Sequence, residues 1–270
     1  MRYVQGFIIA VVVWVTASLA FSHGRHGLTG SVNIEVVSEK GSTFLTIPHQ
    51  DFWKGRTHII KGYLEARRGE NYGIVIRNGT SERIGVVVAV DGRNIISGKK
   101  SDLKNTEDMY VVDGYGHGQY DGWRTAGDKV NRFYFTDMDD SYTMRTFNDS
   151  SSMGVIAVAI YREKDQPKPL LKEKKADWVP GAPSAGSPAR GKMGGIMNEA
   201  AGTGFGDEKY SPTVRVVFEP EDAPIQKTLV KYEWRDVLCR KGILNCQQEP
   251  RNRLWEEDNY APYPPGYSRK

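Results

Sequence analysis

Two short runs of β-branched residues most constrain how this chain folds. They read Ile84-Gly-Val-Val-Val-Ala-Val90 and Gly154-Val-Ile-Ala-Val-Ala-Ile-Tyr161, and each ends at turn or charged residues. Short β-branched runs bounded in this way are typical of strands rather than helices. Because every successive residue is apolar or small, both faces of each strand must be covered. We therefore predict two central strands that lie between two layers of the protein.

Other segments have the alternating pattern of half-buried strands. The turn sequences between them, Arg67-Arg-Gly-Glu70, Asn78-Gly79 and Asp91-Gly92, favour antiparallel hairpins. Short strands at this spacing are typical of a sandwich or barrel rather than of βαβ units. We predict a mainly β fold, an antiparallel β-sandwich. Its half-buried strands are Val32–Val37, Ile59–Ala66, Tyr72–Arg77, Met109–Val112, Arg132–Thr136 and Val214–Glu219.

The composition divides the chain after the first sandwich strands. Residues 28–162 form the predicted β-sandwich domain, and residues 163–195 are a linker rich in Lys, Pro and Gly. Residues 196–246 contain the strands Val214–Glu219 and Thr228–Tyr232 and a helix over Glu233–Lys241. Such a short unit cannot bury a core alone, so we expect it to dock on the sandwich and complete it. Residues 247–270 are a tail rich in Tyr and Pro.

An apolar N-terminal segment predicts the compartment. Phe7 to Ala20 follows Arg2 and precedes small residues, which is the pattern of a secretory signal peptide over residues 1–22. The run is shorter than the roughly 20 apolar residues that span a bilayer. We predict an exported protein, periplasmic or extracellular, cleaved after Ala20 or Ser22. If the segment stays uncleaved, it anchors the protein and gives membrane association.

The two cysteines, Cys239 and Cys246, are predicted to form a disulfide bond, as expected in an oxidising compartment. A structural zinc site needs four ligands, and the spacing is not the redox CxxC motif. Seven residues of continuous helix rise about 10 Å, whereas bonded Cα atoms lie about 5.5 Å apart. We expect Gly242 to end the helix in the left-handed conformation and so bring the sulfur atoms together.

Charge and short motifs argue against several functional classes. The chain has 37 basic and 33 acidic residues spread along its length, a formal net charge of +4, which does not favour a nucleic-acid partner. Gly202-Thr-Gly-Phe-Gly-Asp207 lacks the Lys-Ser/Thr of a phosphate loop and is interpreted as an irregular loop whose glycines allow close backbone approach. Asp137-Met-Asp-Asp-Ser141 does not match a calcium loop and favours a helix N-terminus. Asp91 and Asn94 could orient a ligand, but their types favour a turn.

The best candidate binding surface is Gly114-Tyr-Gly-His-Gly-Gln-Tyr-Asp-Gly-Trp-Arg124. Its aromatic and polar side chains suit stacking on a sugar ring or a peptide from a loop at the end of a sandwich. In the alternative interpretation the aromatic rings pack in the core and the arginine pairs with a carboxylate. The candidate ligand-binding residues are Tyr115, His117, Tyr120, Trp123 and Arg124.

A second chemistry depends on the cleavage site. Cleavage after Ser22 makes His23 the first residue, and its amino group and ring could chelate copper together with His26, His58 or His117. This arrangement resembles the copper brace of lytic polysaccharide monooxygenases, which are also β-sandwiches. Cleavage after Ala20 leaves Phe21 first and removes the site. N-terminal sequencing of the secreted product distinguishes the two cases.

A set of motifs resembles a family of uncharacterised bacterial exported proteins. The set comprises Asn71–Asn78, Val88-Ala-Val-Asp-Gly-Arg-Asn-Ile-Ile-Ser-Gly98, Gly122-Trp-Arg124, Ser141-Tyr142, Gly154–Tyr161, Gly202–Asp207, Tyr210-Ser-Pro212 and Val217-Phe218. The resemblance implies one architectural unit with the linker as a variable insertion, and it transfers no catalytic residue. We expect a non-catalytic envelope binding or assembly module that needs no cofactor and binds an envelope protein or a glycan. The alternative is a secreted copper enzyme that uses His23.

Overall fold

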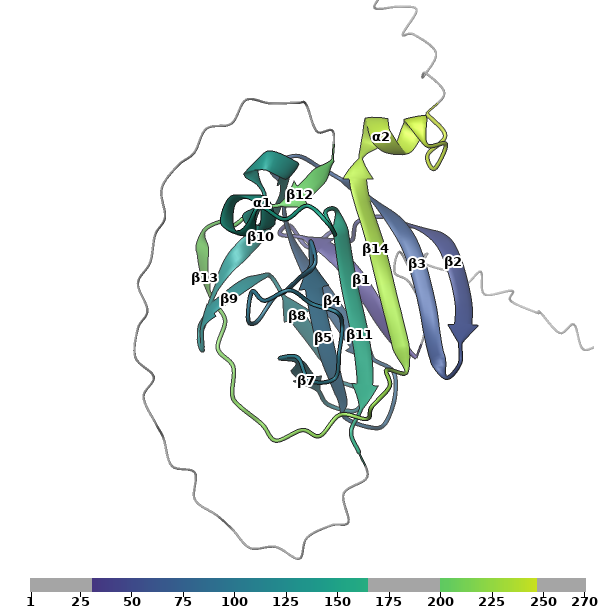
Figure 1. Ribbon diagram of the computed structural model, residues 1–270, viewed down its shortest axis with the longest axis vertical. Helices are drawn as coiled ribbons and strands as arrows, with labels where there is room; N and C mark the ends of the chain where they lie inside the picture. The colour runs from purple at the N-terminus through teal and green to yellow at the C-terminus, as the bar shows by residue number, and fades with distance from the viewer. Residues whose placement is uncertain (1–30, 165–199, 247–270) are drawn as a thin grey trace, which may run out of the picture.

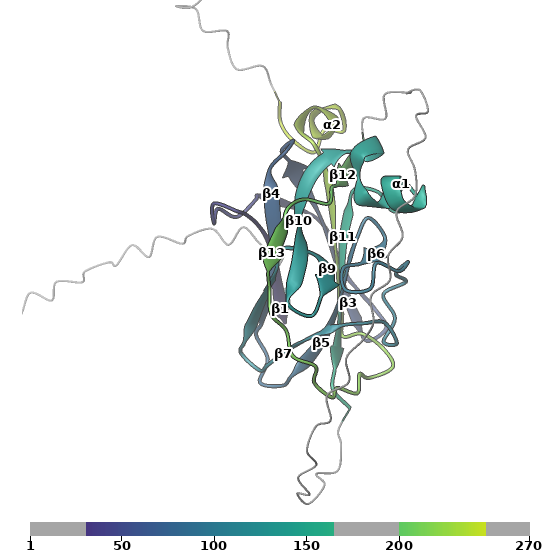
Figure 2. The same cartoon turned by 90° about the vertical axis from the view of Figure 1, so that its left-hand side faces the viewer.

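Two β-sheets pack face to face within residues 31–164 and 200–246, the part of the chain that the computed structural model describes (Figure 1). The predicted mainly β sandwich is confirmed. Figure 2 shows the two layers from the side, with β4 and β10 in one layer and β3 and β11 in the other. The predicted signal segment and the tail, and all but two residues of the predicted linker, lie outside the described residues.

The first sheet has the strand order β1-β4-β10-β12, and all its pairs are antiparallel. Strand β8 pairs with β4, and β9 and β13 pair with β10. This sheet carries the candidate site described below. Its strands are β1 (Val32–Ser38), β4 (Asn71–Asn78), β8 (His117–Tyr120), β9 (Gly122–Ala126), β10 (Lys129–Asp137), β12 (Ala201–Thr203) and β13 (Glu208–Tyr210).

The second sheet has the order β2-β3-β14-β11-β5-β6, with β7 on β5. All seven residues of β5 are buried, and β11 lies between β5 and β14, so the two predicted central strands are confirmed. The pair of β3 and β14 is parallel. The strands are β2 (Thr46–Lys54), β3 (Thr57–Ala66), β5 (Ile84–Val90), β6 (Arg93–Asn94), β7 (Tyr110–Val112), β11 (Val155–Arg162) and β14 (Gln226–Trp234).

The core lies between the inward faces of the sheets and is rich in aromatic rings. Tyr72 stacks on Phe135 with ring centroids 4.3 Å apart, and Phe44 meets Phe135 edge to face at 5.5 Å. Val32, Ile34 and Val36 of β1 are buried while the residues between them are partly exposed. This two-residue period shows which side chains of each strand point away from the core.

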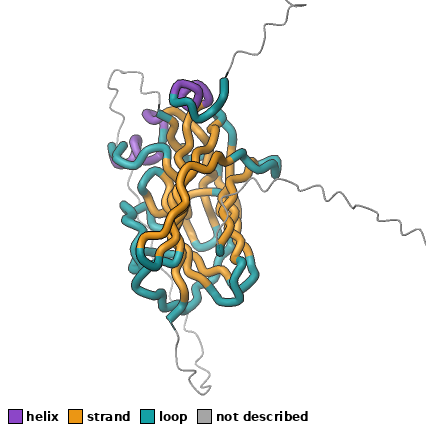
Figure 3. Tube along the Cα trace, turned by 90° about the vertical axis from the view of Figure 1, so that its right-hand side faces the viewer, coloured by secondary structure: helices purple, strands orange, loops and turns teal. Residues whose placement is uncertain are grey.

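Three short helices lie at one end of the sandwich (Figures 1 and 3). They are η1 (Met138–Asp140), α1 (Tyr142–Phe147) and α2 (Arg235–Arg240). The predicted disulfide between Cys239 and Cys246 is confirmed, with Cα atoms 5.5 Å apart. Gly242 has φ +68°, which is the predicted left-handed conformation after the helix.

Two of the three predicted hairpins are wrong. Arg67–Glu70 and Asn78–Gly79 connect strands that lie in different sheets, so these segments cross between the layers. Asn78 accounts for the second crossing, because its side chain donates to the carbonyl oxygens of Glu82 and Asp113 and accepts from the Thr80 amide. Only Asp91-Gly92, with φ +49° and +77°, forms the predicted tight hairpin between β5 and β6.

The predicted strand over Val214–Glu219 is also wrong. This segment belongs to no strand, although its Val217 carbonyl accepts from Arg83 and its Glu219 carbonyl accepts from the Lys164 amide. Val214 is 86% exposed and Val217 is 81% exposed. Strand propensity reflects packing against neighbours, and here the valines have none to pack against.

The chain after residue 200 completes both sheets. Strand β12 pairs with β10 in the first sheet, and β14 lies between β3 and β11 in the second. Thr228–Tyr232 was predicted as a strand and lies within β14. In the described ranges, no helix is long and apolar enough to cross a bilayer.

Candidate functional site

The structure does not place the five predicted ligand-binding residues on one surface. His117, Gln119 and Asp121 alternate with Gly118 and Tyr120, so the two sets point to opposite sides of β8. Tyr120 faces Ile74 of β4 across the ladder and packs against the core. The polar members of this loop therefore point outward, and its rings point mainly inward.

Trp123 and Tyr120 have packing roles. Trp123 is 2% exposed, donates from Nε1 to the Gly204 carbonyl at 3.0 Å and meets Phe133 edge to face at 5.2 Å. Tyr120 stacks on Tyr110 with centroids 4.3 Å apart. Burial raises the pKa of Tyr120, and the neighbouring Tyr110 adds to the effect. These two rings match the alternative in which they belong to the core.

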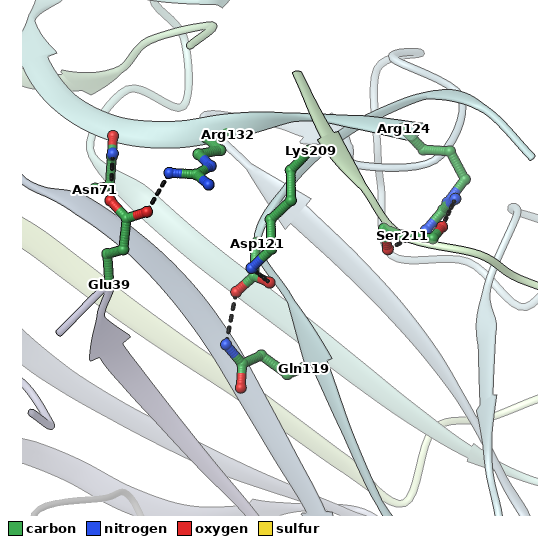
Figure 4. A network of polar contacts seen from close by, with 8 residues as sticks. All are labelled: Glu39, Asn71, Gln119, Asp121, Arg124, Arg132, Lys209 and Ser211. Atoms are coloured by element: carbon green, nitrogen blue, oxygen red, sulfur yellow. Dashed lines mark hydrogen bonds and ion pairs between the residues drawn. The ribbon is translucent and has the colours of Figure 1, made fainter. Parts of the chain in front are cut away.

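Arg124 connects β9 to the segment that follows β13. Its Nε donates to the Tyr110 hydroxyl at 2.7 Å, and Nη1 donates to the Ser211 carbonyl at 3.0 Å (Figure 4). The predicted carboxylate partner is replaced by a phenol and carbonyl oxygens. Its donors are therefore engaged with the protein itself.

Tyr115 and His117 are the two predicted residues that remain accessible. Tyr115 is 76% exposed, has φ +56°, and donates its amide to the Thr80 carbonyl. His117 is exposed at the start of β8, opposite Arg77 of β4. His117 and Gln119 share the outward face of β8, about 7 Å apart along the strand.

A polar hollow lies on the outer face of the first sheet, around the Asn71–Gly73 end of β4. Figure 4 shows the polar contacts among its charged residues. Gly73 of β4 forms part of its floor, because a side chain there would overlap the Asp121 carboxylate. The absence of a side chain at this outward position leaves a depression between the surrounding side chains. The hollow is lined by Ser38, Glu39, Asn71, Tyr72, Gly73, Gln119, Asp121, Arg132 and Lys209.

The charges of the polar hollow are paired within it. Glu39 accepts from Asn71 Nδ2 at 2.7 Å and from Arg132, while Asp121 accepts from Lys209 Nζ at 2.7 Å and from Gln119 Nε2 at 2.8 Å. The hydrogen bond from Asn71, with the positive charges of Arg132 and Lys209, lowers the pKa of Glu39. The site is thus neutral in sum and offers both donors and acceptors.

None of the residues that line the polar hollow was among the predicted binding residues. The strict alternation in His117-Gly-Gln-Tyr-Asp121 is a usable signal, since a two-residue period separates inward from outward side chains. Glu39, Asn71, Arg132 and Lys209 come from elements that only the folded topology brings to the same place.

Asp91 is buried and has a structural role. It is 2% exposed, and its carboxylate accepts from the Gly154 amide at 2.8 Å, the Thr203 amide at 2.8 Å and the Tyr232 hydroxyl at 2.5 Å. Thr203 Oγ1 contacts the hydroxyls of Tyr232 and Tyr72, each at 2.7 Å. This Asp91 network joins both sheets across the core. Asn94 likewise serves its turn by accepting from the Ile96 amide at 2.9 Å.

The remaining motifs have local structural roles. A side chain at Gly204 would overlap the Tyr134 ring, which agrees with the close approach predicted for this loop. Ser141 caps α1 by accepting from the Met144 amide at 3.3 Å, and the acidic residues before it lie in η1. Among the residues that the structure describes, no group of three or more potential ligands could hold a metal ion. His23 and His26 lie outside those residues, and His58 contacts Asp51.

Comparison of the chain with protein-family models, with curated proteins and with solved structures finds no match to any of them. The resemblance to exported bacterial proteins therefore stays a prediction.

Proposed function

We propose that this protein is an exported, non-catalytic binding or assembly module of the cell envelope. Its partner, an envelope protein or a glycan, binds on the outer face of the first sheet at the polar hollow. The observation that carries this proposal is the hollow itself, where donors and acceptors surround a glycine floor. The Cys239–Cys246 disulfide is compatible with an oxidising, extracytoplasmic compartment.

The chemistry of the hollow suits hydrogen bonding to a neutral ligand. Lys209 has two ammonium hydrogens beyond the one given to Asp121, and each carboxylate has lone pairs to spare. Hydroxyl-rich sugars and exposed peptide groups both donate and accept, so both match such a lining. Glu39 is a poor general acid near neutral pH because its lowered pKa keeps it ionised. The Ser38 hydroxyl contacts that of Ser42 at 2.7 Å instead of a base.

The proposal is tested with the secreted protein immobilised and exposed to solubilised envelope fractions. One fraction is treated with protease and another with glycosidases, so that the two partner classes are separated. The variant combining Gln119→Ala and Lys209→Ala should retain about tenfold less partner, because two hydrogen-bonding groups are lost. Lys104→Ala is the matched control, since Lys104 also donates to an aspartate, Asp102, at 3.0 Å.

Thermal unfolding of both variants should stay close to that of the wild type, because Lys209 and Gln119 are surface groups. Full retention of the partner by the double variant would exclude the polar hollow as the binding site. Loss of binding in the Lys104 control would show that the assay responds to surface charge in general.

A further inference from the structure

Four basic side chains that form no ion pair among the described residues lie together on the second sheet; Lys40, Lys99 and Lys100 also form none but belong to other parts of the surface. Most Lys and Arg residues in the described part of the chain form an ion pair with a carboxylate, as Arg235 does with Glu65 and Lys164 with Asp222. Lys54, Arg56, Lys61 and Lys227 form none among the residues that the structure describes. They lie on the hairpin of β2 and β3 and on the adjoining strand β14.

The strand register places these side chains on the outer face. Ile60 and Leu64 of β3 belong to the core, so Ile59 and Lys61 point outward. Phe52 of β2 and Lys227 of β14 both lie beside Ile59. The basic hairpin face consists of Phe52, Lys54, Ile59, Lys61 and Lys227, with Arg56 in the adjoining turn. Lys61 Nζ lies 5.8 Å from the centre of the Phe52 ring.

Little unpaired negative charge lies on this face. Glu65, the next outward acidic residue of β3, pairs with Arg235 at 3.1 Å. Asp51 is the only acidic residue between Thr46 and Leu64, and it lies opposite the core-facing Ile60. Its Oδ1 lies 2.5 Å from His58 Nε2, and the His58 ring stacks on Trp53 with centroids 4.7 Å apart. The carboxylate is therefore held on the side of the hairpin away from the lysines.

The tip of the hairpin exposes an aromatic ring on each side. Phe52 is 41% exposed and Trp53 is 66% exposed. Gly55, with φ +61°, allows the two-residue turn between Lys54 and Thr57, so the tip is narrow. Along the free edge of β2, Pro48 lacks an amide and the register shifts between Pro48 and Gln50. Both features disfavour the addition of a partner strand.

We propose that the basic hairpin face and the Trp53 tip bind the surface of a bilayer that contains anionic phospholipid. Lysine and arginine near such a surface are attracted to its charge, and tryptophan is enriched at the membrane interface. The unpaired lysines supply the complementary charge, and Phe52 and Trp53 supply apolar area at the tip. This surface lies on a different sheet from the polar hollow and does not depend on it.

The test uses the secreted full-length product and co-sedimentation with vesicles. Vesicles of phosphatidylcholine alone are compared with vesicles containing about one third phosphatidylglycerol, at low and at physiological salt. Binding should require the anionic lipid and weaken with salt. The variant combining Lys54→Gln, Lys61→Gln and Lys227→Gln should reduce the partition coefficient about a hundredfold, since each basic residue contributes roughly fivefold.

Matched variants make the result decisive. Lys40→Gln, Lys99→Gln and Lys100→Gln together remove the same charge from exposed sites elsewhere and should leave binding unchanged. Trp53→Ser should weaken vesicle binding without changing the requirement for anionic lipid. Equal binding to both vesicle types, which an uncleaved apolar N-terminus would give, would overturn the proposal. So would wild-type binding by the Lys54, Lys61 and Lys227 variant, or binding to soluble dextran sulfate but not to anionic vesicles.

The variant combining Gln119→Ala and Lys209→Ala keeps the basic hairpin face intact and should bind vesicles normally. Failure of the envelope partner assay and failure of the vesicle assay are therefore distinguishable.

Discussion

The Asp91 network predicts a specific dependence of folding stability on pH. Burial raises the pKa of Asp91, and the hydrogen bonds from Tyr232, Thr203 and Gly154 lower it. Burial is the larger effect, so the pKa is about 6. In the unfolded chain the carboxyl ionises at its ordinary pKa of about 3.8. The folded state therefore binds more protons than the unfolded state between these values, so its stability falls as pH rises through this window.

The size of the effect follows from the two pKa values. Ionisation of the buried carboxyl lowers the free energy of unfolding, relative to its value at low pH, by about 1 kcal/mol at about pH 4.5 and by about 3 kcal/mol at about pH 7. Asp91→Asn removes this titration and keeps a residue that tolerates the left-handed φ of +49°. Whichever way the side-chain amide of the Asp91→Asn variant is turned, its NH2 group meets another N–H donor, the backbone amide of Gly154 or of Thr203. This clash of two donors lowers the free energy of unfolding by about 1–3 kcal/mol, and the loss does not vary with pH.

The measurement is urea unfolding of wild type and Asp91→Asn at both pH values and constant ionic strength. Stability of the variant relative to wild type should increase by about 2 kcal/mol from about pH 4.5 to about pH 7. Asp222→Asn, whose carboxylate is 88% exposed, is the control and should show little change. A constant difference across pH would refute the reasoning. A shift in the opposite direction would show that the hydrogen bonds outweigh desolvation.

Two further stability predictions concern the glycine-rich loop and the disulfide. Gly204→Ala should lower the free energy of unfolding by about 1–3 kcal/mol in a urea titration, because the new methyl group overlaps the Tyr134 ring. Gly127→Ala is the control and should be near neutral, because nothing lies within 4 Å of the new methyl group. A wild-type result for Gly204→Ala would contradict the packing described. Replacing Cys239 and Cys246 with serine should cost about 2.5 kcal/mol by loss of the short cross-link, measured by urea unfolding against the oxidised wild type. Unchanged stability would mean that α2 unfolds separately from the sandwich.

The sequence predicted the strands whose side chains carry a strong local pattern. The apolar runs of β5 and β11 require cover on both faces, and the structure buries every residue of β5. The disulfide and the left-handed Gly242 followed from helix geometry and chain distance. Strand β2 was not predicted, because Thr46–Lys54 is an edge strand whose residues are mostly exposed and so need no alternation.

The pairing of strands that lie far apart in the chain could not be predicted from the sequence. The turn residues after β3 and β4 favoured hairpins, but whether two strands join one sheet depends on partners far along the chain. Strand β14 pairs in parallel with β3 across more than 150 residues, and no local signal specifies that choice. The same limit applies to the polar hollow, where Glu39 and Lys209 approach Arg132 and Asp121 only after both chain halves have joined the first sheet.

The two outer faces of the sandwich differ in how their charge is balanced, and this difference separates the two binding proposals. In the polar hollow each carboxylate already has a cation beside it, so a neutral ligand displaces no counterions and its binding should depend weakly on salt. On the basic hairpin face Lys54, Lys61 and Lys227 lack such partners within the described residues, so attraction to an anionic surface must weaken as salt screens it. The two proposals together therefore place membrane contact on one sheet and the envelope partner on the other, so that neither site blocks the other.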